Sequence, residues 1–204
     1  MLPRINVTTN IVAVADVLTR SFSDSPVTAY VLHNKDSTWH APIIPLDILQ
    51  PKMVEWTTYK AKIGGELVEA GDYAAAAIWF PPGVDLPASS DDDERLVEYR
   101  KTSGKLKKEF LKGRQYWYLN MIGRHPERSD PGVIRALFEP YIERAHEQKV
   151  PIWLEAVSDH SRQVYEHFGF KTVATFRIGL GKVTPRGELQ EGGEGIPLYA
   201  MILE

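Results

Sequence analysis

The residues best suited to chemistry lie between positions 114 and 170. A loop at 124–132 joins an apolar stretch to an amphipathic one, where a parallel α/β unit holds a phosphate. Glu155 ends a second apolar stretch, in the sequence LEA. A carboxylate in a partly buried cleft has a raised pKa and can act as a general base. The alternative is that Glu155 is a structural acceptor for backbone N–H groups or for an arginine.

The histidines do not have the spacing of a metal site. No two of them stand in an HxxxH arrangement. The chain has no cysteine, which excludes thiolate nucleophiles and thiolate metal ligands. We therefore expect no bound metal. His125 in the loop and His160 after the second strand are within reach of a cleft, but both have the character of ordinary surface residues. The six histidines are His33, His40, His125, His146, His160 and His167.

Hydrophobic periodicity predicts the elements that must position these residues. A helix over 133–147 has its apolar residues on one face, and mostly apolar strands at 115–123 and 150–156 flank it. A short helix at 161–168 ends at Gly169. Two further strands, 171–180 and 196–203, are expected to pair. The helix stripe comprises Ile134, Leu137, Phe138, Tyr141, Ile142 and Ala145.

The first half of the chain has the same mixed character. An acidic run at 91–94 admits two interpretations, a cation site or the start of a helix. The helix start is favoured because lysines gather toward position 112, as the helix dipole requires. The whole predicts one α/β domain over 1–204, with a mixed, twisted central sheet and helices on both faces. The other expected elements are a strand at 4–8, a helix at 11–22 capped by Asn10, a turn at 27–32, a helix at 45–63, and a hairpin of 66–69 and 73–80.

Composition limits which partners and which cellular location we expect. The 204 residues carry a net charge of −3, so nothing indicates nucleic-acid binding. No apolar run approaches the ~20 residues of a membrane span. The N-terminus lacks a basic segment followed by an apolar one, so we expect a cytoplasmic protein without a membrane partner. The sequence does not distinguish a monomer from a homodimer.

The motifs WYLNMIGRHPE, VPIWLEA and VYEHFGF, in that order around the 133–147 helix, resemble the GNAT superfamily of acyl-CoA-dependent N-acyltransferases. The segments FSDSP at 22–26 and WFPPG at 79–83 also resemble its small-molecule branch, which includes puromycin N-acetyltransferase. The resemblance is strongest over 116–173. It implies a sheet that splays between strands 115–123 and 150–156. It also implies acetyl-CoA as cofactor and transfer of its acetyl group to an amine of a small molecule.

The resemblance also implies roles for individual residues. Tyr165 falls where the family places the tyrosine that protonates the leaving thiolate, although its ring could instead pack on the core beside Phe168. Glu155 would be the general base. The expected acceptor contacts are Phe22, Asp24 and Trp79. The expected cofactor contacts are Met121, Ile122, Gly123, Arg128, Ser129, Gly132 and Ser161.

The loop departs from the family's pattern, which is [RQ]-x-x-G-x-[GA]. Aligned on Ser129–Ile134, the pattern retains only Gly132. Asp130 is the expected N-cap and Pro131 the first helical residue, which would satisfy the helix start internally and leave less for an anion. Three arginines, Arg124, Arg128 and Arg135, could compensate with charge.

This degenerate loop leaves two alternatives beside the acyltransferase. One is a diverged GNAT-fold enzyme that no longer uses acetyl-CoA and performs another acid–base reaction on a small metabolite, such as decarboxylation, cyclisation or isomerisation. The other is a non-catalytic binding or regulatory protein of the same fold.

Overall fold

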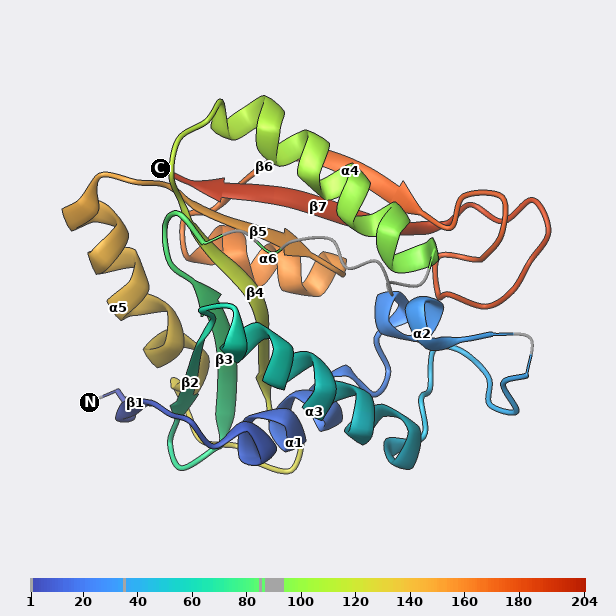
Figure 1. The fold of residues 1–204 in the computed structure, drawn as a ribbon, viewed down its shortest axis with the longest axis horizontal. Coiled ribbons are helices and arrows are strands. Elements are labelled where there is room, and N and C mark those ends of the chain that lie inside the picture. Colours follow the sequence, from blue (N-terminus) through green and yellow to red (C-terminus); the bar gives the residue numbers. More distant parts are fainter. Residues whose placement is uncertain (1, 35, 85, 87–93) are drawn as a thin grey trace. The chain divides into compact units, whose positions relative to one another are not determined.

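The computed structural model describes residues 2–34, 36–84, 86 and 94–204 (Figure 1). Seven strands form a sheet in the order β1-β2-β3-β4-β5-β7-β6, and the expected mixed α/β architecture is confirmed. The chain forms two compact units, each assembled from three segments. The first unit comprises Met1–Phe22, Leu46–Leu86 and Gln115–Ile152, and the second comprises Ser23–Pro45, Pro87–Arg114 and Trp153–Glu204.

Four antiparallel strands form the centre of the first unit. They are β1 (Ile5–Val7), β2 (Glu66–Ala70), β3 (Ala75–Phe80) and β4 (Trp117–Arg124). The hairpin of β2 and β3 is confirmed, with Ala70 opposite Ala75 across a turn. The run of alanines in β3 is strand rather than helix. Its residues are fully buried, and their small side chains allow helices to approach both faces of the sheet.

Helices cover both faces of these strands. Helix α1 (Ile11–Phe22) packs against β3, β4 and α3 (Leu46–Lys62), whereas α5 (Val133–Gln148) packs against β2, β3 and β4. Trp79 of β3 stacks on Tyr141 of α5, with ring centroids 4.4 Å apart. Gly123 of β4 lies against Ser21 of α1 instead. The two helices therefore lie on opposite faces, and β5 (Ile152–Ala156) follows α5.

The second unit contains the other pair of neighbouring strands, β6 (Lys171–Ile178) and β7 (Ile196–Leu203). They pair antiparallel from Lys171 opposite Ile202 to Ile178 opposite Ile196, as expected. Helices α4 (Glu94–Leu111) and α6 (Asp159–His167) both contact β6, and α2 (Pro26–Leu32) contacts α4. In Figure 1, α4 runs along the two strands.

Two helix starts differ from expectation because side-chain caps determine them. The segment expected as a turn at 27–32 is helix α2, since the Ser25 hydroxyl accepts the Thr28 N–H at 3.3 Å and Pro26 suits a first turn. Helix α6 begins two residues before Ser161, because Ser158 and Ser161 form a capping box. Asn10 caps α1 as predicted, and its Oδ1 accepts the Ala13 N–H at 3.1 Å.

The helix that corresponds to α4 was expected to start in the acidic run, and Asp91, Asp92 and Asp93 of that run lie outside the described residues. Within the described ranges, none of the helices has the length and apolar character that a membrane span requires. In the same part of the chain, no group of three or more acidic or histidine side chains is arranged to hold a metal ion.

Two glycines provide a matched test of this packing. A Cβ at Gly123 would lie 2.4 Å from Ser21 Oγ, whereas a Cβ at Gly104 in α4 meets nothing within 4 Å. We expect Gly123→Ala to destabilise the protein by about 1–3 kcal/mol through overpacking. Gly104→Ala should stabilise it by about 0.5–1 kcal/mol because it lowers the entropy of the unfolded chain. Urea unfolding measures both. Equal stability of Gly123→Ala and the parent would contradict the close approach of α1 to β4.

Candidate active site

Glu155 is the centre of a polar network within the second unit. It lies on β5, and its side chain is only 1% exposed. Its Oε1 accepts hydrogen bonds from the Ser103 hydroxyl and from Trp153 Nε1, the latter at 2.7 Å, and Lys107 Nζ lies 3.8 Å from the same oxygen. The Tyr99 hydroxyl contacts Oε2 at 3.3 Å. A carboxylate this deeply buried requires such donors, because desolvation penalises an unpaired charge.

Helix α4 supplies three of the four partners. Tyr99, Ser103 and Lys107 stand at intervals of four residues, which places them on one face of the helix. The first turns of α4 are attached to α2 through Tyr30, whose hydroxyl donates to Glu98 at 2.9 Å and whose carbonyl accepts from Arg95 at 2.8 Å.

The sequence analysis missed this network. It expected the structural acceptor role of Glu155 to involve backbone N–H groups or an arginine, whereas the donors in these contacts are side chains and the cation is a lysine. The four-residue repeat of a phenol, a hydroxyl and an ammonium was the signal in the sequence. The role of Glu155 as general base stays a prediction.

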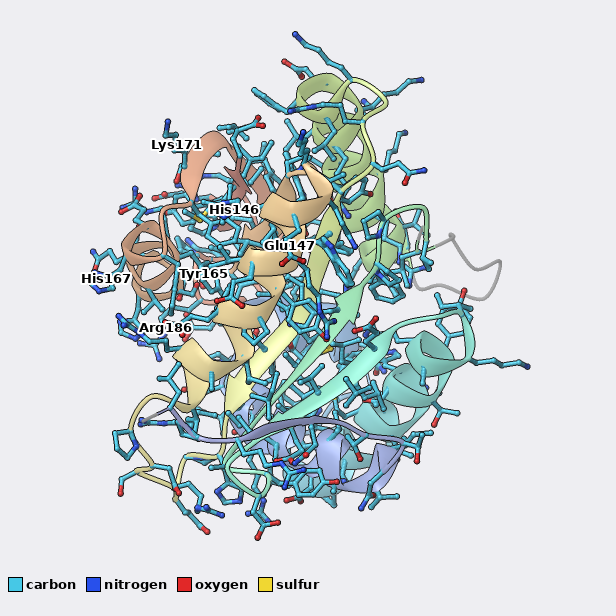
Figure 2. The ribbon with its side chains drawn as sticks, turned by 90° about the vertical axis from the view of Figure 1, so that its left-hand side faces the viewer. His146, Glu147, Tyr165, His167, Lys171 and Arg186 are labelled. Carbon is cyan, nitrogen blue, oxygen red and sulfur yellow. The ribbon has the colours of Figure 1, made fainter. Side chains whose placement is uncertain are left out.

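Tyr165 lies on α6 in the same unit. Its ring centroid is 6.2 Å from that of Phe170. Burial raises the pKa of Tyr165 above its ordinary value, so the phenol is protonated at neutral pH. Tyr165 is half-buried, whereas His167 in the last turn of the same helix is exposed and projects outward in Figure 2. A protonated phenol has the properties that a general acid needs.

Strand β4 contains an irregularity that the sequence did not reveal. Ile78 of β3 is opposite Met121, and the next residue, Trp79, is opposite Leu119. Asn120 is therefore the extra residue of a β-bulge. Bulges are common beside active sites, because they free backbone groups from the ladder. The Asn120 side chain donates to the Tyr118 hydroxyl at 3.2 Å, while its buried Oδ1 has no hydrogen-bond partner.

The predicted strand contacts adjoin this bulge. Met121, Ile122 and Gly123 follow Asn120 on β4 and pair with β3, and the first two are half-buried. Lys60 Nζ lies 3.3 Å from the sulfur of Met121. No pattern in the sequence distinguishes a bulged strand from a regular one, because both are apolar and of similar length.

The predicted cap of α5 is wrong. Helix α5 begins at Val133 after Gly132, which has a left-handed φ of 77° and makes no side-chain cap. Asp130 instead receives two hydrogen bonds from Arg128, from Nε at 2.8 Å and from Nη2 at 2.9 Å. A two-point guanidinium–carboxylate pair is stronger than a neutral cap. As a result, no side chain caps the N–H groups of the first turn of α5 from the N-cap position.

Arg128 has a structural role that the sequence did not suggest. Its guanidinium donates to the carbonyl oxygens of Gly71 and Asp72, at 3.0 and 3.3 Å. It therefore ties the loop to the turn between β2 and β3. The Arg128 guanidinium also lowers the pKa of Asp130. Most donors of Arg128 are thus used within the protein.

Two predicted cofactor contacts have different surroundings. Ser161 donates its hydroxyl to the Ser158 carbonyl at 3.0 Å, so this group serves the start of α6. Ser129 is exposed on the loop.

The three predicted acceptor contacts differ in how far they are buried. Phe22, at the end of α1, is half-buried, and Asp24 is exposed. Trp79 is fully buried in the core against α5. This burial argues against contact between Trp79 and an acceptor, and it arises because helices cover both faces of the sheet at β3.

Relatives of known sequence place the chain in a family. The family model "YOR012W acetyl transferase domain" matches residues 6–85. The Saccharomyces cerevisiae "Uncharacterized protein YDR391C" is 30% identical over 204 residues, which cover 99% of this chain and 87% of the relative. The Schizosaccharomyces pombe "Uncharacterized N-acetyltransferase C550.08" is 29% identical, over 76% of this chain and 68% of its own length.

Solved structures agree at the level of the fold. The C-terminal condensation domain of Ebony superimposes with a TM-score of 0.70 at 10% identity and covers both chains fully. An acetyltransferase from Corynebacterium glutamicum, described as histone acetyltransferase HPA2 and related acetyltransferase, gives 0.62 at 19% identity, over 99% of this chain and 96% of its own. Mosquito arylalkylamine N-acetyltransferase like 5b gives 0.59 at 13%, over 98% of each chain. The chain belongs to one family with the Saccharomyces cerevisiae protein YDR391C, and its fold is that of the GNAT N-acetyltransferases.

The contribution of Lys107 to the Glu155 network can be tested against that of the adjacent Lys108. Lys107→Met would leave a buried carboxylate without its cation, and Lys108→Met removes an exposed lysine one position later. We expect Lys107→Met to lower the free energy of unfolding by about 1.5–3 kcal/mol, in the range of hydrogen bonds to charged groups. Lys108→Met should stay within about 0.5 kcal/mol of the parent. Urea unfolding at pH 7 measures both, and equal effects would show that the ion pair does not contribute.

Proposed function

We propose that this protein transfers the acetyl group of acetyl-CoA to a primary amine of a small molecule. The observation that carries the proposal is the start of α5. Gly132 adopts a left-handed conformation there, and no side chain caps the helix from this position. Backbone N–H groups at a helix N-terminus bind phosphate oxygens. The reason for expecting this helix end to be satisfied internally no longer holds, because Asp130 pairs with Arg128 instead.

Other described groups fit the same ligand. The backbone of β4 at 121–123 would hold the pantetheine arm beside the bulge at Asn120. Arg124 is exposed next to the loop, and Arg135 is exposed in the first turn of α5. Asp130 opposes these cations with its negative charge. When bound, acetyl-CoA supplies a thioester as the acyl donor.

The protein's own groups would then perform acid–base work. Tyr165, protonated at neutral pH, would give its proton to the departing thiolate. Glu155 would receive the proton that the amine loses.

The choice of an amine acceptor is supported by what several solved neighbours are named for. They include arylalkylamine and agmatine N-acetyltransferases and a domain bound to β-alanyl-dopamine. Their identity to this chain is low, so they guide the choice of test compounds. Tyramine, tryptamine, dopamine and agmatine form a first panel.

Two measurements test the proposal. Acetyl-CoA at 100 times its Kd should stabilise the protein by about 2.7 kcal/mol in a thermal shift experiment. Release of free thiol in the presence of each amine reports turnover. The absence of a shift at millimolar acetyl-CoA, together with the absence of turnover, would overturn the proposal.

Tyr165→Phe keeps the ring and removes the acid. We expect kcat to fall by about 10²–10⁴-fold, with little change in KM. Because burial raises the pKa of Tyr165, its acid form persists as pH rises. The basic limb of the parent's pH profile should therefore lie above pH ~10, the ordinary value for tyrosine. Tyr199→Phe is the control, since Tyr199 donates to Asp159 at 2.8 Å in the same unit. Similar losses in both variants would contradict the acid role.

Asp130→Asn should strengthen the binding of acetyl-CoA. The change removes a negative charge near the start of α5 and releases Arg128, so we expect Kd to fall about two- to fivefold. Since Arg128 lowers the pKa of Asp130, its charge is present at every pH above the ordinary ~3.9. The effect should thus be equal at pH 6 and pH 8.

Glu127→Gln provides the control for Asp130→Asn, because it removes the same charge from an exposed position on the same loop. Calorimetric titration measures both variants. An equal gain in affinity for acetyl-CoA in Glu127→Gln would show that the effect of Asp130→Asn comes from net charge alone.

A further inference from the structure

The burial of Glu155 limits how it can receive a proton. With 1% of its side chain exposed, its carboxylate is not open to direct contact with a substrate amine. A proton that reaches Glu155 must therefore pass through a group that contacts it. The described partners are Trp153, Lys107, Ser103 and Tyr99.

These partners differ in whether they can relay a proton. A relay group must accept one proton and donate another. The indole N–H of Trp153 and the ammonium of Lys107 only donate, whereas the hydroxyls of Ser103 and Tyr99 can do both. Ser103 is buried at 4% exposure. Tyr99 is half-buried, so of these two hydroxyl partners it belongs to the more exposed residue.

The surroundings of Tyr99 hold its ring in place. Like Val27, Val157 and Phe176, it packs against the apolar cluster around Tyr30. In the described contacts the ionisable groups that face Glu155 are Tyr99 and Lys107, both from α4.

We propose that Tyr99 is the proton relay between the acceptor amine and Glu155. The ammonium nitrogen of the acceptor first loses a proton, directly or through one water, to the phenol oxygen of Tyr99, while the phenolic proton passes across the 3.3 Å contact to Oε2 of Glu155. The free amine then attacks the thioester, the amide C–N bond forms and the C–S bond breaks. The thiolate takes the proton of Tyr165, and the Tyr165 phenolate regains a proton through solvent from the nitrogen, which gives up its second proton as the amide forms. Tyr99 ends unchanged, and Glu155 returns its proton to solvent by the reverse route.

The inference rests on the proposed function and is tested with Tyr99→Phe, which keeps the packed ring and removes the relay hydroxyl. With tyramine and acetyl-CoA at pH 7, kcat should fall about 10²–10⁴-fold while KM for acetyl-CoA is unchanged. An alkylamine has a pKa near ~10, like that of lysine. Near pH 10 much of the amine is already deprotonated, so the loss should shrink to a few-fold. A loss that is the same at both pH values indicates a structural role and overturns the relay.

Tyr30→Phe is the matched control. It also removes a tyrosine hydroxyl bound to a glutamate of α4, Glu98, at 2.9 Å. Its expected effect is on stability, without the dependence of turnover on pH. If Tyr30→Phe shows the same recovery at high pH, the relay is overturned.

A readout without turnover separates failure of the relay from failure of the proposed function. In protein labelled with ¹³C at glutamate Cδ, Glu155→Gln identifies the Glu155 resonance. Tyr99→Phe should shift that resonance, and Tyr30→Phe should not. If the parent acetylates no amine of the panel, the proposed function fails, and a shift in Tyr99→Phe still supports the contact on which the relay depends. An unmoved resonance overturns the relay in either case.

Discussion

The burial of one carboxylate constrains this structure more than any other single interaction. Glu155 lies on an interior strand with almost no exposed surface, and an ionised group in such a place needs donors on both oxygens. Helix α4 is therefore tied to β5 by Tyr99, Ser103 and Lys107. In the proposed mechanism, the same donors determine how a proton reaches the carboxylate, so stability and chemistry would depend on one set of contacts.

A second charged pair, Arg128 with Asp130, affects which groups could bind a ligand. Arg128 and Asp130 satisfy each other on the loop before α5 and attach that loop to the turn at Gly71 and Asp72. The pair withdraws an arginine from ligand binding, and it also withdraws an aspartate from the helix start. The first turn of α5 is left with backbone N–H groups that no side chain caps from Gly132. An anion can use those groups even where the loop departs from the pattern of its family.

Local sequence signals predicted the elements well because local interactions form them. The Ile134–Ala145 stripe, the cap at Asn10 and the Gly-containing turn after β2 each depend on residues a few positions apart. The cap of α5 was predicted wrongly because Asp130 had two available partners. The backbone of the helix was the local one, and the guanidinium of Arg128 offered the stronger pair once the turn at Gly71 held it in place.

The sequence by itself determined the mixed α/β fold, the family resemblance and the candidates Tyr165 and Glu155. Only the tertiary structure decided the environment of each, because burial and long-range contact are not local properties. It buried Glu155 under α4, which is some 50 positions earlier in the chain. It also placed Trp79 in the core and produced the bulge at Asn120. A periodic pattern indicates which face of a strand is apolar, but which side chains meet across that face is fixed by packing between distant segments.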